Sequence, residues 1–144
     1  MIRFSSACWV LAALAFGSVA LAAEPDLSTP EAVIRGSLQL LRDGKVDDWV
    51  STYCSKSSLC QGNEQIAEQK RYGLARAAIN SKLCLHGEKD EIVVTRTKGD
   101  PAKDATVTVW VKCEEARLPV PTTLTRVVAA NGPPAGWQVS SFSW

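Results

Sequence analysis

The strongest constraint on the fold is that helical and strand patterning occupy separate parts of the chain. Residues 105–113 alternate with a period of two, which indicates a strand with one face on a core. Residues rich in strand formers also fill 91–97, 122–130 and 137–144, and turn residues separate them. One side of the 105–113 strand carries Ala105, Val107, Val109, Val111 and Cys113, and the other carries Thr106, Thr108, Trp110 and Lys112.

Before residue 90 the pattern is helical. A first helix is predicted at 29–43, where Ser28 or Thr29 caps it, Ser28 and Glu31 fit a capping box, and Pro30 suits the first position. Gly44 is placed to end this helix. Its apolar stripe consists of Val33, Ile34, Leu38, Leu40 and Leu41.

Two further helices are predicted at 46–54 and 64–83, the second of them interrupted by Gly73. Its predicted buried side consists of Ile66, Tyr72, Ala75, Ile79 and Leu83. Helices followed by strands predict an α+β fold, with N-terminal helices packed on a curved, cone-like antiparallel sheet of about four strands. A pocket is expected between the sheet and the helices.

The first 22 residues have the features of a secretory signal peptide. Arg3 supplies a positive start, residues 7–20 are an uncharged apolar run, and Ala20-Leu21-Ala22 offers small residues for cleavage. An uncleaved anchor is the alternative, but the run is shorter than the ~20 residues that a membrane-spanning helix needs. We therefore predict one domain at 23–144, located in the periplasm or secreted, with no integral membrane segment after cleavage.

Four cysteines remain after that cleavage: Cys54, Cys60, Cys84 and Cys113. An even number in an exported chain favours two disulfides, for which three connectivities exist. We favour Cys54–Cys60, which closes a short polar loop, and Cys84–Cys113, which ties the end of a helix to the end of a strand. A zinc site is disfavoured because no C-x-x-C pair occurs and the chain has a single histidine.

The charge balance gives no reason to expect nucleic acid as a partner. The full chain has 16 basic and 15 acidic residues, and the predicted signal peptide contains one of the basic ones. A net charge near zero also gives little attraction to anionic lipid.

Several short motifs resemble the nuclear transport factor two-like superfamily, in particular its exported, lumazine-binding-like branch. They are 29–33 (TPEAV), 40–45 (LLRDGK) with Asp48-Trp49, 104–109 (DATVTV) and 136–139 (GWQV). The resemblance covers nearly all of residues 23–144 and implies a cone-shaped domain. It also implies that a homodimer can form through the sheet, as in many domains of that superfamily.

Enzymes of that superfamily place an aspartate, histidine or tyrosine inside the cone, where an apolar pocket shifts its pKa. In this chain His86 lies in a predicted loop, Asp47 and Asp48 open a helix, and Glu114 and Glu115 follow a strand. Each has an ordinary structural explanation, so we assign no catalytic residue. No phosphate-binding or dinucleotide motif is present in the sequence, and we expect no cofactor and no metal.

The aromatic residues and one arginine are the better candidates for ligand binding. These candidates are Trp49, Tyr53, Trp110 and Arg126. The function expected is non-enzymatic binding of a small apolar ligand or of a partner protein, as in an envelope accessory or inhibitor-like protein. The alternative is a small cone-fold enzyme of the isomerase or cyclase type that uses a pocket aspartate or His86.

Overall fold

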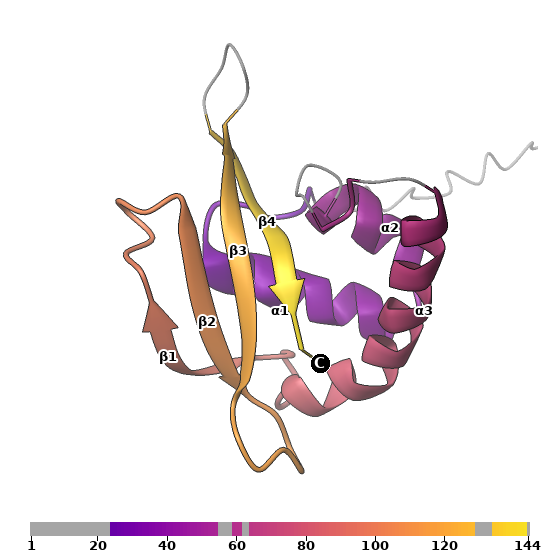
Figure 1. The fold of residues 1–144 in the computed structure, drawn as a ribbon. Helices are drawn as coiled ribbons and strands as arrows, with labels where there is room; N and C mark the ends of the chain where they lie inside the picture. The colour runs from indigo at the N-terminus through magenta and orange to yellow at the C-terminus, as the bar shows by residue number, and fades with distance from the viewer. Residues whose placement is uncertain (1–23, 55–58, 62–63, 129–133, 144) are drawn as a thin grey trace, which may run out of the picture.

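The structure is a computed structural model that describes residues 24–54, 59–61, 64–128 and 134–143; at 64–72, 134 and 135 it describes the backbone. Three helices lie against one face of a four-stranded antiparallel sheet (Figure 1). The predicted α+β fold is therefore confirmed. The predicted signal peptide lies outside the described residues.

Helix α1 (Pro30–Arg42) begins and packs largely as its sequence predicts. The Thr29 hydroxyl caps it by accepting a hydrogen bond from the Ala32 amide at 3.2 Å. The capping box predicted from Ser28 is wrong, because the Ser28 hydroxyl donates to Asp26 instead, at 2.6 Å. The predicted stripe is buried except at the half-buried Leu40, and the buried residues are Pro30, Val33, Ile34, Ser37, Leu38 and Leu41.

Gly44 ends α1, as predicted, by adopting a left-handed backbone with φ of 71°. The Lys45 amide donates to Leu40 O at 2.9 Å and the Gly44 amide to Leu41 O at 3.0 Å, which together form a Schellman motif. Helix α2 (Val46–Trp49) begins directly afterwards and continues as a π-helical turn, η1 (Val50–Cys54). The predicted 46–54 helix is thus present, with a widened second half.

Helix α3 (Glu64–Ser81) runs through Gly73 without a break and ends in the short 3₁₀ turn η2 (Lys82–Cys84). The predicted buried side is wrong at Ala75, which is exposed, and at Ile79, which is 66% exposed, whereas Leu83 is half-buried against the core. The helix instead buries Leu74, Ala77 and Ser81, and it packs against α1. Alanine-rich helices give little contrast between their faces, so the sequence pattern could not choose between two neighbouring stripes. The side chains of Ile66 and Tyr72 lie outside the described residues.

The sheet is a simple meander in which β1 (Val93–Lys98), β2 (Thr106–Lys112), β3 (Val120–Val128) and β4 (Pro134–Phe142) pair in chain order. Val107, Leu124 and Val139 lie opposite one another on the face that meets the helices. Register shifts interrupt the β1–β2 and β3–β4 ladders, and such bulges bend a sheet. The helical layer covers β2 and β4, but every residue of β1 is exposed.

An ion pair joins the end of α1 to the turn before β1. Arg42 Nη1 donates to Asp90 Oδ1 at 2.5 Å, and Gln39 Nε2 donates to Asp90 Oδ2 at 3.2 Å. The hydrogen bond from Arg42 is the main cause that holds the pKa of Asp90 below its ordinary value, and the bond from Gln39 adds to it.

We expect Arg42→Ala to raise the pKa of Asp90 toward the value of about 3.9 found in unfolded chains. Because the pKa of Asp90 is depressed in the folded state, the pair stabilises the protein above the unfolded pKa. That stability is lost as the pH falls through the folded pKa. Carboxyl carbon NMR titration of Asp90 measures the change, with Arg35→Ala on the same helix as the control. An unchanged Asp90 titration in Arg42→Ala would contradict this origin of the shift.

Candidate functional site

An apolar pocket of about 230 Å³ opens where the end of α2, the middle of α3 and the end of β4 meet. Among the described residues that line it, Ser141 is the one with a hydroxyl, and none of them carries an ionisable group. The lining consists of Trp49, Leu59, Cys60, Gly73, Leu74, Ser141 and Phe142.

Trp49 anchors this pocket to the core. Its side chain is fully buried, and its ring meets the ring of Phe142 edge to face, with centroids 5.6 Å apart. The indole Nε1–H donates to the hydroxyl of Ser37 on α1. A hydrogen bond on one side and a ring contact on the other fix the orientation of the indole, so one wall of the pocket is rigid.

A disulfide holds a second wall of the pocket. Cys54, the last residue of η1, is bonded to Cys60, with Cα atoms 5.5 Å apart. Cys60 and its neighbour Leu59 both line the pocket. The predicted Cys54–Cys60 disulfide is therefore confirmed, and it holds an apolar segment at the pocket that Leu74 of α3 also lines.

Tyr53, a predicted ligand-binding residue, lies one turn after Trp49 and is buried beside α1. It packs so closely on Gly36 that a Cβ atom there would overlap the Tyr53 hydroxyl. Burial raises the pKa of this hydroxyl, and the charge of Asp26 acts in the same direction. Tyr53 is not among the residues that line the pocket.

The other two predicted ligand-binding residues lie elsewhere. Trp110 is half-buried between Val109 and Val111, which are both fully buried, so its ring is on the sheet face opposite the helices. Arg126 lies over the ring of Trp137, 4.8 Å from its centroid, and donates to the carbonyl of Pro101. Of the four predicted ligand-binding residues, the structure thus brings only Trp49 to the pocket.

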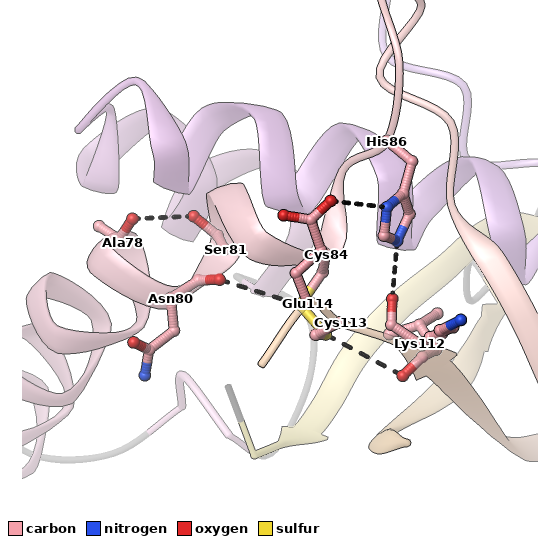
Figure 2. Close-up of a disulfide and its surroundings, with 9 residues drawn as sticks. Ala78, Asn80, Ser81, Cys84, His86, Lys112, Cys113 and Glu114 are labelled. Atoms are coloured by element: carbon pink, nitrogen blue, oxygen red, sulfur yellow. Dashed lines mark hydrogen bonds and ion pairs between the residues drawn. A yellow bond between two sulfur atoms is a disulfide. The ribbon is translucent and has the colours of Figure 1, made fainter. Parts of the chain in front are cut away.

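The second predicted disulfide, Cys84–Cys113, is also confirmed. His86 lies close to it (Figure 2). Its Nε2 donates to Lys112 O at 2.9 Å, and its Nδ1 lies 3.8 Å from a Glu114 carboxylate oxygen. The backbone of His86 also exchanges two hydrogen bonds with the backbone of Glu91. His86 therefore connects the start of the sheet to the end of β2, and it does not line the apolar pocket.

The remaining acidic candidates stay at the surface. Asp47, Asp48, Glu114 and Glu115 are all exposed. In the part of the chain that the structure describes, no group of three or more His, Cys, Asp or Glu residues is arranged to hold a metal ion. None of the helices in the described part of the chain has the length and apolar character needed to cross a bilayer.

Sequence reasoning missed most of the pocket. Leu59, Leu74 and Phe142 come from three separate parts of the chain, and nothing in their local patterns marks them. The one usable signal for the pocket was the predicted Cys54–Cys60 disulfide. A bond from the end of a helix to the next loop must fold that loop back toward the helix. Gly73 interrupts a helical pattern, and in the structure it leaves space at the pocket.

Comparison of this chain with protein-family models, with curated proteins and with solved structures gives no match. The resemblance to the nuclear transport factor two-like superfamily is therefore a proposal that rests on the motifs quoted above.

Proposed function

We propose that this protein is an exported, non-enzymatic binding domain whose pocket beside Trp49 holds one small apolar group. The observation that carries the proposal is the pocket itself: it measures about 230 Å³, and its described lining consists of apolar side chains, a disulfide and one hydroxyl. Dedicated small-molecule sites usually measure about 300–1,000 Å³, so this pocket suits a single ring or a branched alkyl group. A dry cavity of about 150 Å³ is enough for benzene.

The pocket's chemistry favours binding over catalysis. General acid or base catalysis needs an ionisable group within hydrogen-bond reach of the reacting atoms. None of the described lining residues offers one, and His86 is engaged by Lys112 O away from the pocket. The alternative, a cone-fold enzyme of the isomerase or cyclase type, would need an aspartate or His86 to face this space.

Two disulfides support the compartment in this proposal. Such bonds persist in oxidising environments, which agrees with the periplasm or the extracellular space. The predicted signal peptide points in the same direction. In that setting the apolar group belongs either to a free small molecule or to a side chain of an envelope partner.

Fluorobenzene is a suitable probe, because it is apolar, fits the pocket and reports binding through its fluorine NMR signal. We expect it to bind the wild-type protein and to shift the methyl signals of Leu59 and Leu74. We expect Gly73→Leu to abolish that binding, because Gly73 lines the pocket and a leucine side chain there would take up part of its volume.

The matched control is Ala75→Leu, which adds apolar atoms to an exposed position on the same helix and should leave binding intact. Gly73→Ala should keep most of the pocket and stabilise α3 by up to about 1 kcal/mol. The proposal is overturned if fluorobenzene leaves the Leu74 methyl signals unmoved, or if Gly73→Leu binds it as well as the wild type does.

A further inference from the structure

Strand β1 offers an open edge at the side of the sheet. It pairs with β2 along one edge, and no other described strand pairs with it. All six of its residues are exposed, including Val93 at 44% and Val94 at 36%. An exposed edge of this kind presents backbone amides and carbonyls that can pair with an added strand.

The sheet face opposite the helices is cationic beside this edge. The Arg96 guanidinium lies 4.8 Å from the centroid of the Trp110 ring, its partner across the strands. Lys98 and Lys112 stand on the same face, opposite Thr108 and Val93. No described acidic residue forms an ion pair with any of these three cations. Stacking on Trp110 orients the guanidinium group of Arg96 and leaves its N–H donors free to bind a carboxylate.

The side of β1 that faces the start of α1 has more acidic than basic residues. There a groove of about 440 Å³ runs between Val94 and the start of α1, and its described lining carries three acidic residues, Asp26, Glu31 and Glu91, and one basic residue, Arg35. A strand added at this edge would direct alternate side chains to the two sides. Carboxylates are favoured on the Arg96 side and disfavoured on the groove side.

We propose that the β1 edge binds an extended segment of a partner protein that carries acidic residues at every second position. The segment joins the sheet as a fifth strand, its carboxylates meet Arg96 and Lys98, and its intervening uncharged side chains lie toward the groove. This site is separate from the apolar pocket. The charge pattern argues against a second copy of β1 as the occupant, because pairing two copies would bring additional arginine and lysine side chains to the same edge.

A short acetylated peptide of alternating glutamate and threonine is the probe. We expect it to bind and to protect the β1 amides from hydrogen exchange. A peptide of the same composition with its glutamates contiguous should bind more weakly, and so should one with lysine in place of glutamate. Methylating the backbone nitrogens that face β1 should abolish binding, whereas methylating the alternate nitrogens should preserve it.

Charge reversal at the edge provides the matched variants. We expect Arg96→Glu and Lys98→Glu each to weaken peptide binding by about tenfold, since each replaces an attraction with a repulsion. Lys45→Glu makes the same charge change at an exposed position between α1 and α2 and should have no effect. Gly73→Leu should also leave peptide affinity unchanged, which separates this proposal from that of the pocket.

Three results would overturn the inference. The first is equal peptide affinity in Arg96→Glu and the wild type. The second is a concentration-dependent dimer that protects the β1 amides without any peptide. The third is binding of an acidic polysaccharide such as polygalacturonate at this face, with no binding of the peptide.

Discussion

Replacing Cys84 and Cys113 together with alanine should lower the free energy of unfolding by about 3–4 kcal/mol. The bond closes a loop with a sequence separation of 29 residues, so it restricts the unfolded chain strongly. It also connects η2, at the end of the helical layer, to the residue that follows β2. Both sulfur-bearing side chains are buried, which makes alanine a better replacement than serine. Urea unfolding of the oxidised wild type and the double variant measures the difference.

The other disulfide is the internal control for this prediction. Cys54 and Cys60 are separated by 6 residues, so replacing both should cost less, about 2–2.5 kcal/mol in the same chain-entropy description. Equal losses in the two double variants would show that loop length does not govern their stabilisation. A larger loss from the short loop would instead point to the packing of Cys60 in the pocket wall.

Truncating Trp49 should have an effect of similar size. We expect Trp49→Ala to lose about 3–5 kcal/mol, the usual cost of removing a large buried ring. The side chain is fully buried, contacts Phe142 and donates a hydrogen bond to Ser37. Its removal enlarges the pocket and leaves the buried Ser37 hydroxyl without that donor. Thermal and urea unfolding both report the loss.

Trp49→Phe separates the two contributions to this effect. A phenyl ring retains much of the apolar contact but cannot donate to Ser37, so we expect it to cost about 1–3 kcal/mol. The double variant Trp49→Phe with Ser37→Ala should recover part of that cost, because the unpaired hydroxyl is then gone. If adding Ser37→Ala lowered the free energy of unfolding further, the unpaired Ser37 hydroxyl would not be the cause of the destabilisation in Trp49→Phe.

The parts of the fold that the sequence predicts well depend on strong local signals. Alternating valines in β2 place Val107, Val109 and Val111 inside, and Gly44 ends α1 through a backbone conformation that other residues rarely adopt. The two disulfides were favoured among three connectivities because one closes a short loop and the other ties a helix end to a strand end. The face of α3 was predicted wrongly because alanines offer equal packing on neighbouring stripes, and Ile79 is exposed although it is a strongly apolar residue of the predicted stripe.

The candidate site was harder to predict, because its walls come from segments far apart in the chain. Trp49 could be chosen as a large aromatic residue, but its partner Phe142 lies at the far end of the sequence. Trp110 has the same residue type and lies on the opposite face of the sheet. Composition alone cannot separate these tryptophans, since only the tertiary structure determines which ring meets the helices.

The two ends of the described chain meet at β4. The Trp137 amide donates to Leu27 O at 2.9 Å, just before α1, and β4 contacts both α1 and η1. A nascent polypeptide therefore completes its helices well before it contains the strand on which they rest. A chain that stops short of residue 134 lacks the part of the core that β4 supplies to α1 and the Phe142 ring that contacts Trp49. Exposed apolar surface of this kind makes an incompletely folded chain prone to aggregation, so β4 completes the fold.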